Sequence, residues 1–189
     1  MRRLIVSEFI TLDGVMEDPG GVEGFERGGW AFQFERGPQG DQFKFDEVMA
    51  SEALLLGRNT YEVFAASWPS RTGPFAEKMN SMPKYVVSKT LEKANWNNST
   101  LLRGDVVEEV ARLKAGPGGD LLVAGSGQLV DALIAHDLAD EYRLMVYPLI
   151  LGDGKRLFQE QSDKLALRLV ETKPVGSGVL ILIYQPDRK

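Results

Sequence analysis

The sequence has no cysteine and only one histidine, His136. Without cysteine, disulfides, thiolate metal sites and a cysteine nucleophile are excluded, and one histidine leaves little for a zinc site or a Ser-His-Asp triad. Basic runs are absent and the formal net charge is −5, so the usual footprint of a nucleic-acid-binding protein is missing. No apolar run is long enough to cross a membrane, and charges follow Met1 too closely for a signal peptide. We therefore expect a cytoplasmic protein that binds no metal, nucleic acid or membrane.

What is present favours one α/β domain spanning residues 1–189. A chain of 189 residues with 43% hydrophobic content can bury one sizeable core. Short apolar runs alternate with segments of helical periodicity, which predicts a mostly parallel sheet. The predicted strands are 4–10, 53–56, 84–87, 100–102, 121–124 and 140–150, and the predicted helices are 41–49, one from about Tyr61, 105–114 and one after Gly127. The predicted loops are 17–40 and 68–83, and the chain closes with an antiparallel hairpin of 164–170 and 179–184 joined by 173–178.

The turn Gly125-Ser126-Gly127 separates the predicted strand 121–124 from the helix that follows it. Its small residues allow a ligand to approach the main chain, and the unpaired amides and dipole of the helix N-terminus suit a phosphate. The pattern is not the dinucleotide fingerprint, because Val130 occupies the position of its third glycine. A phosphate site and a tight turn that binds nothing are equally compatible with this motif alone.

Two more predicted strands end in polar residues that can bind phosphate. After the strand 53–56 come Gly57 and then a guanidinium, an amide and a hydroxyl, and after the strand 84–87 come a hydroxyl and an ammonium. These side chains belong to Arg58, Asn59, Thr60, Ser88 and Lys89. Because the carboxyl ends of parallel strands meet at one edge of the sheet, all three turns are expected to share a crevice, which favours a dinucleotide. Arg58 and Lys89 would meet the 2′-phosphate that distinguishes NADPH from NADH.

Four segments taken together resemble those of the dihydrofolate-reductase-like reductases, within the group similar to the reductase domain of the bifunctional riboflavin-biosynthesis deaminase/reductase. They are Thr11–Gly14, Leu56–Glu62, Tyr85–Leu91 and the stretch from Gly125 to Phe158. The resemblance implies a three-layer dihydrofolate-reductase-like fold with a mostly parallel central sheet, an antiparallel C-terminal strand and NADPH across the carboxyl edge. No deaminase segment with zinc ligands precedes these motifs, so we expect a stand-alone reductase.

The resemblance also assigns residues to the two ends of the cofactor. The adenosine and 2′-phosphate end would be held by Gly57, Arg58, Thr60, Ser88 and Lys89. The pyrophosphate and nicotinamide side would be held by Ala124, Gly125, Ser126, Gly127 and Gln128. Residues 11–14 would form a mobile loop near the nicotinamide.

The activity implied by the resemblance is NADPH-dependent hydride transfer to a small heterocyclic or ribosylaminopyrimidine-type substrate, as in a 5-amino-6-(5-phosphoribosylamino)uracil reductase. The glycine- and aromatic-rich segment 17–40 replaces the compact substrate side of dihydrofolate reductases, so dihydrofolate reduction is an alternative rather than our main prediction. A dinucleotide-binding protein without turnover is a second alternative. Whether the segment 17–40 is a lid or an ordered surface loop stays open.

Asp41 is the candidate catalytic acid. It precedes Gly57 by 16 residues, a spacing similar to that of the acid in dihydrofolate reductases. It also stands where the predicted helix 41–49 begins, and aspartate is a preferred N-cap whatever the function. A catalytic acid and a helix cap are therefore both compatible with the sequence.

The C-terminal strands predict an assembly. Residues 179–183 are apolar on both faces, and Leu165, Leu167 and Leu169 add a further stripe. Because large apolar patches on soluble proteins usually mark interfaces, we predict a two-fold homodimer built on these strands. The alternative is that helices cover both faces of the sheet.

Overall fold

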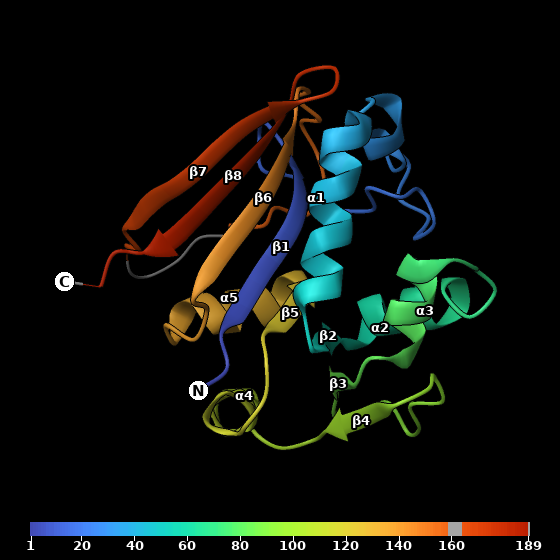
Figure 1. Ribbon diagram of the computed structural model, residues 1–189, viewed down its shortest axis with the longest axis vertical. Coiled ribbons are helices and arrows are strands. Elements are labelled where there is room, and N and C mark those ends of the chain that lie inside the picture. Colours follow the sequence, from blue (N-terminus) through green and yellow to red (C-terminus); the bar gives the residue numbers. More distant parts are fainter. Residues whose placement is uncertain (159–163, 189) are drawn as a thin grey trace.

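The computed structural model describes residues 1–158 and 164–188, which are built around a central twisted sheet (Figure 1). Within these residues the sheet has eight strands in the order β4-β3-β2-β5-β1-β6-β8-β7. The strands are Leu4–Thr11 (β1), Ala53–Gly57 (β2), Lys84–Val87 (β3), Ser99–Leu102 (β4), Leu121–Ala124 (β5), Glu141–Tyr147 (β6), Leu167–Val175 (β7) and Val179–Pro186 (β8). Neighbours from β4 to β6 pair in parallel, and β8 runs antiparallel to β6 and β7. The predicted mostly parallel sheet with an antiparallel strand near the C-terminus is confirmed.

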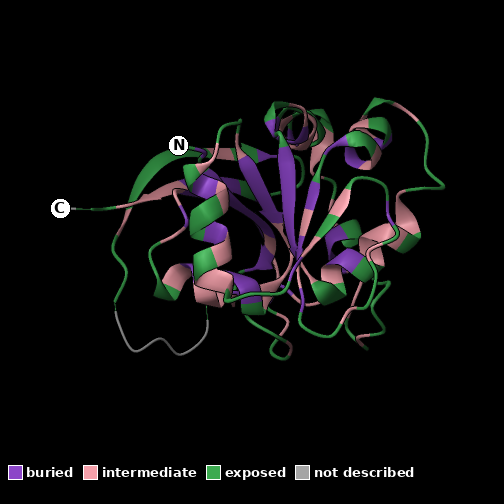
Figure 2. Cartoon of the chain, turned by 90° about the horizontal axis from the view of Figure 1, so that it is seen from below, coloured by how far each residue is buried: buried purple, intermediate pink, exposed green. Residues whose placement is uncertain are grey.

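Helices cover both faces of the sheet, so that its central strands are buried between them (Figure 2). The helices are Trp30–Gln33 (η1, a 3₁₀ helix), Gly37–Ala50 (α1), Arg58–Ser67 (α2), Pro74–Ser81 (α3), Val106–Ala115 (α4) and Gly127–Ala135 (α5). Leu54 packs on the face covered by α1, α2 and α3, whereas its neighbour Leu55 packs on the face covered by α4 and α5. Successive strand residues point to opposite faces, and this two-sided burial explains why β2 reads as a continuous apolar run.

The segment between β1 and α1 packs onto the sheet. Trp30 is fully buried, its ring lies 5.3 Å from that of Tyr147 between centroids, and its Nε1 donates to the main-chain oxygen of Glu17 at 2.9 Å. The buried carboxylate of Asp18 accepts three main-chain amides of the segment, including that of Val22 at 2.7 Å. The aromatic-rich segment thus folds over the sheet through its buried tryptophan.

One helix is missing from the prediction, and the predicted starts of two others are wrong. Residues 68–83, predicted as a loop, contain α3, because Pro74 has the φ that suits the first turn of a helix and Gly73 precedes it with φ 95°. The helix predicted from Asp41 begins at Gly37, with a proline again in its first turn. The helix predicted from about Tyr61 begins at Arg58, directly after the strand.

The strand boundaries near the C-terminus also differ from the prediction. The strand predicted for 140–150 ends at Tyr147. The strand β7 continues to Val175 through Pro174, so that the connection to β8 shortens to Gly176–Gly178. Proline is tolerated there because β7 is an edge strand.

Candidate active site

The turns that follow β2 and β5 touch each other at the carboxyl edge of the sheet. The main-chain N–H of Gly57 donates to Ser126 Oγ at 2.8 Å. A Cβ on Gly125 would lie 2.8 Å from Thr60 Oγ1, so a side chain there would force one of the two turns to move. Gly125 and Ser126 both have left-handed backbone conformations, with φ of 62° and 67°. Two of the three turns predicted to bind phosphate therefore form one surface.

The turn after β3 joins this surface through Arg58. Arg58 Nη1 donates to Thr90 Oγ1 at 2.7 Å, and Nε donates to Glu62 at 3.1 Å, with the side chain 44% exposed. Ser88 is buried, and its Oγ accepts two main-chain amides of the turn that follows. Lys89 is exposed beside Thr90. The three turns thus come together as predicted, although the Ser88 hydroxyl also serves to shape its own turn.

Two helix N-termini without side-chain caps begin at this surface. Gly57 and Ser126 are the N-cap residues of α2 and α5, and neither gives a side-chain hydrogen bond to a helix amide. By contrast, α4 is capped by Asp105, whose carboxylate accepts two first-turn amides. Uncapped first-turn amides carry the positive end of the helix dipole and suit phosphate oxygens. Asn59 and Gln128 lie exposed in these first turns, so the donor set fits a pyrophosphate.

Glu8 is a residue of this site that the sequence did not single out. Its Oε2 accepts the main-chain N–H of Gly125 at 2.9 Å, and its Oε1 is buried without a hydrogen-bond partner among the described residues. Burial raises the pKa of the Glu8 carboxyl well above its usual range, despite the hydrogen bond from Gly125. The one signal in the sequence was the pair Ser7-Glu8 inside an otherwise apolar strand.

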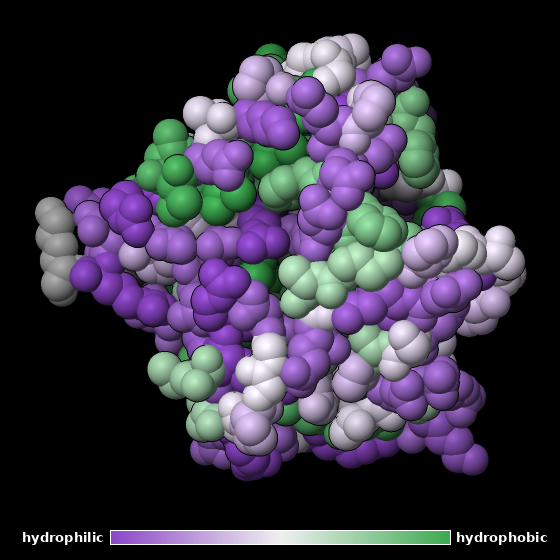
Figure 3. Space-filling view, in the orientation of Figure 1, coloured by the Kyte–Doolittle hydropathy of each residue, from purple (hydrophilic) through white to green (hydrophobic). Residues whose placement is uncertain are grey.

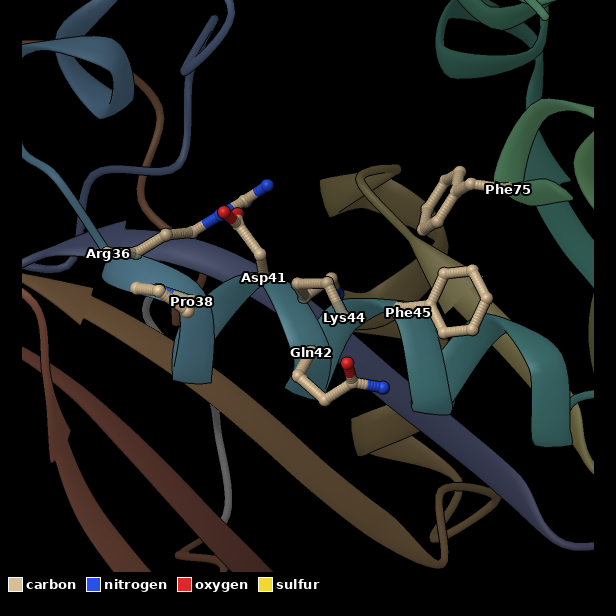
Figure 4. Close-up of a pocket in the computed structure, with 7 residues that line it drawn as sticks. All are labelled: Arg36, Pro38, Asp41, Gln42, Lys44, Phe45 and Phe75. Carbon is tan, nitrogen blue, oxygen red and sulfur yellow. The ribbon is translucent and has the colours of Figure 1, made fainter. Parts of the chain in front are cut away.

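Two adjoining pockets open beside the N-terminal half of α1, with volumes of about 530 and 420 Å³. Figure 4 shows the first, where side chains from α1 face Phe75 of α3 across the opening. Both pockets are lined by Arg36 and Asp41. Their aromatic lining residues are Phe45 and Phe75 in the first and Phe9, Phe32, Phe34 and Tyr147 in the second. The aromatic side chains suit a flat organic molecule, and the charged residues Arg36, Asp41 and Lys44 in the lining of the first pocket can meet its polar groups.

Asp41 lines these pockets but does not cap a helix. The N-cap of α1 is Arg36, so Asp41 lies in the second turn and the helix-cap interpretation is wrong. Its Oδ1 accepts a hydrogen bond from Arg36 Nε at 2.6 Å, and its side chain is 64% exposed. The catalytic role of Asp41 stays a prediction.

A buried ionic network lies between α1 and the sheet, and no pattern in the sequence predicts it. Lys44 and Glu47 of α1 contact Ser7 of β1, and Glu47 lies 3.7 Å from the guanidinium of Arg143 on β6. Lysine and glutamate three residues apart on a helix are ordinarily a solvated pair. Only the packing of α1 against β1 buries this one.

The segment after β1 is tied to the segment after β6 by Asp13. Its carboxylate accepts the Thr11 hydroxyl at 2.6 Å and the main-chain amides of Leu151 and Gly152 at 3.1 and 2.8 Å. Partial burial opposes ionisation of Asp13, but these hydrogen bonds outweigh it and lower the pKa of Asp13 to about 2. The residues 11–14 predicted to form a mobile loop are thus fastened at Asp13 in this conformation.

We expect Asp13→Asn to lose about 1 kcal/mol of unfolding free energy at pH 7 and less in acid. The folded pKa is depressed, so the stabilisation is complete above the unfolded value near 4 and declines as the pH falls toward 2. Urea unfolding of both proteins at pH 7 and pH 3 measures this. An equal difference at the two pH values would contradict the role of the Asp13 charge.

Within residues 1–158 and 164–188, no three His, Cys, Asp or Glu side chains gather as a metal site. In the same part of the chain, no helix has the length and apolar character of a membrane span.

The sequence matches known proteins along almost its whole length. A family model described as the RibD C-terminal domain matches residues 2–181. The chain belongs to this family. It is 30% identical over 188 residues to the uncharacterized protein YyaP of Bacillus subtilis (strain 168), covering 97% of this chain and 94% of that protein. It is 28% identical over 179 residues to the uncharacterized protein YwjB of the same organism, covering 94% of this chain and 95% of that protein.

Solved structures share the fold of this RibD C-terminal domain protein. A putative riboflavin biosynthesis protein from Shewanella sp. PV-4 has a TM-score of 0.80 at 23% identity, covering 98% of this chain and 99% of that one. A pyrimidine reductase-like protein from Corynebacterium diphtheriae has a TM-score of 0.66 at 11% identity, covering 100% of this chain and 93% of that one. Dihydrofolate reductase from Enterococcus faecalis, complexed with NADP(H), has a TM-score of 0.60 at 16% identity, covering 98% and 97%. The predicted family and dihydrofolate-reductase-like fold are confirmed, and the family is reductase-like.

Proposed function

We propose that this protein is a stand-alone NADPH-dependent reductase that transfers hydride to a small heterocyclic or ribosylaminopyrimidine-type compound. The observation that carries the proposal is the meeting of two uncapped helix N-termini, those of α2 and α5, beside the exposed guanidinium of Arg58. Amides and a guanidinium at one sheet edge match the diphosphate and 2′-phosphate of NADPH. The NADP(H) bound to the Enterococcus faecalis dihydrofolate reductase, which shares the fold, also supports it.

The residues divide between the two ends of the cofactor as the sequence predicts. Arg58 and Lys89, with the Gly57 and Thr60 turn and Ser88, would hold the adenosine and 2′-phosphate end. The segment Ala124–Gln128 would hold the pyrophosphate and the nicotinamide side. The reduced nicotinamide supplies hydride when it is bound, and the protein aligns it with the substrate in the pocket beside α1 and excludes water. The aromatic side chains of that pocket are suited to a planar ring.

A panel assay tests the proposal against its two alternatives. NADPH binding is titrated first, and NADPH oxidation is then followed with dihydrofolate and other pterins, ribosylaminopyrimidines, other pyrimidines and quinones. We expect NADPH to bind and at least one compound other than dihydrofolate to be reduced. Reduction of dihydrofolate as the best substrate would make the protein a dihydrofolate reductase. Binding of NADPH without oxidation across the panel would favour a protein that binds a dinucleotide without turnover.

We also propose that the protein is a homodimer built on β7 and β8. Leu169, Val170 and Leu180 of these strands are 47%, 47% and 37% exposed, and hydrophobic side chains gather over the two strands in Figure 3. Exposed apolar residues clustered at a sheet edge are typical of an interface. Light scattering is expected to give twice the chain mass of 20.9 kDa. A mass of one chain at all micromolar concentrations would exclude the dimer.

A further inference from the structure

Lys44 reaches from the middle of α1 to the strand β1, and its side chain lines the pocket beside α1. Its Nζ donates to Ser7 Oγ at 2.7 Å and to the carboxylate of Glu47, and lies 5.3 Å from the centre of the Phe9 ring. The side chain is 15% exposed and lines the pocket of about 530 Å³ shown in Figure 4. An ammonium group has three N–H donors, and among the described residues the third has no partner.

The strand register brings this ammonium close to the turn that we propose holds the nicotinamide. Ser7 pairs with Ala124 in the β1–β5 register, and Ala124 directly precedes Gly125. Lys44 therefore links the pocket beside α1 to the strand pair β1–β5, which carries the Gly125 turn. With the substrate in that pocket and the nicotinamide at that turn, hydride would pass between them, where the Lys44 ammonium can touch the reacting atoms.

Glu47 holds Lys44 in this position. Its side chain is 1% exposed, and its carboxylate accepts the Ser7 hydroxyl at 2.8 Å in addition to the Lys44 ammonium. Arg143 lies 3.7 Å from Glu47 and donates to Glu141 at 2.7 Å. Positive and negative side chains therefore alternate along the network that begins at Lys44. Buried ion pairs add little net stability, because desolvation offsets their attraction. Such a network is better explained by the fixed position it gives to Lys44.

Asp41 is less suited to provide a proton. Its carboxylate is 64% exposed and is hydrogen-bonded to Arg36, the N-cap residue of its own helix. In Figure 4 the Asp41 carboxylate lies beside the Arg36 side chain, whereas Lys44 contacts the central strand β1.

We propose that Lys44 is the catalytic proton donor of this enzyme, an inference that rests on the proposed reductase function. The substrate class is a flat conjugated compound whose C=O or C=N group meets the Lys44 ammonium. Bound NADPH would supply hydride from a C–H bond of its nicotinamide to the carbon of this double bond and would itself be oxidised to NADP+. The electron pair of the double bond would then move to oxygen or nitrogen. That atom takes a proton from Lys44, so an N–H bond breaks and an O–H or N–H bond forms. The neutral amine regains its proton from water after the product leaves.

Two substitutions of Lys44 separate proton donation from charge balance. Lys44→Ala removes the donor, whereas Lys44→Arg keeps a positive charge beside Glu47 but cannot be deprotonated. We expect both variants to lose about a hundredfold or more in kcat with the best panel compound. The exposed control Lys93→Ala is expected to stay within about threefold of wild type. Asp41→Asn changes a residue that lines the pocket but not the proposed donor, so it is expected to lose less kcat than Lys44→Ala. Added ethylammonium should restore part of the turnover of Lys44→Ala.

Binding and stability measurements accompany the kinetics. Trp68 stacks on Phe75 with centroids 5.3 Å apart, so intrinsic fluorescence can report occupancy of the pocket. Lys44→Arg is expected to bind NADPH and the panel compound within about threefold of wild type and to unfold at a similar urea concentration. Wild-type turnover in Lys44→Arg would overturn the proposal, and so would a hundredfold loss in Asp41→Asn with Lys44→Ala unaffected. A wild-type protein that oxidises NADPH with no panel compound would overturn the reductase function itself and the donor role with it.

Discussion

Arg58→Ala is expected to weaken NADPH binding by about tenfold to a hundredfold and to leave NADH binding nearly unchanged. A hydrogen bond to a charged group contributes roughly 1.5–3 kcal/mol, and each 1.4 kcal/mol corresponds to about a tenfold change in affinity. Arg58 is anchored by Thr90 and Glu62 but keeps further N–H donors that those contacts do not use. NADH has no 2′-phosphate for them to meet. Fluorescence titrations of the variant with each cofactor measure the two affinities.

Arg112→Ala is the matched control for this experiment. Like Arg58, Arg112 is an exposed helical arginine that pairs with a glutamate of its own helix, Glu109, at 2.9 Å. It lies in the last turn of α4, whereas Arg58 begins α2 at the carboxyl edge of the sheet. The loss of Arg112 should change neither affinity. Equal weakening of NADPH and NADH in Arg58→Ala would show that Arg58 does not recognise the 2′-phosphate.

The parts of the fold that the sequence predicts are those with local signals. The runs at β2 and β5 are apolar because both faces of a central parallel strand are buried, and their order with the helices determines the sheet type. The prediction lacks α3 because Pro74 is typical of a loop, although proline is equally compatible with the start of a helix. The start of α1 is predicted too late for the same reason, because Pro38 lies in its first turn.

The candidate site also has some contacts that can be predicted from the sequence and others that cannot. The meeting of the Gly57 and Gly125 turns could be predicted, because parallel strands bring their carboxyl ends to one edge. The contact of Lys44 with Ser7 could not, since it depends on how α1 is rotated against β1. The contact of Glu8 with the Gly125 turn could not be predicted for a related reason. A single polar residue in a buried strand does not reveal which loop its carboxylate will meet.

Gly125→Ala is expected to weaken both cofactors by at least about tenfold and to lower the unfolding free energy by about 2 kcal/mol or more. A side chain in the left-handed conformation costs roughly 1–2 kcal/mol, and overpacking costs roughly 1–3 kcal/mol more. The new Cβ would lie 2.8 Å from Thr60 Oγ1, so the Gly125 turn, which we propose holds the diphosphate, would move away from the Gly57 and Thr60 turn. NADPH and NADH share the diphosphate, so both affinities should fall together, unlike in Arg58→Ala. Cofactor titrations and urea unfolding measure the two effects.

Gly24→Ala isolates the conformational part of this loss. Gly24 also has a positive φ, 85°, but a Cβ there would meet no atom within 4 Å. It should therefore lose only about 1 kcal/mol of stability and bind both cofactors normally. In the Gly125→Ala background, Thr60→Ala should recover part of the lost stability, because it removes the hydroxyl that the new methyl group meets. If Gly125→Ala behaved like Gly24→Ala in both measurements, contact between the two turns would have no part in cofactor binding.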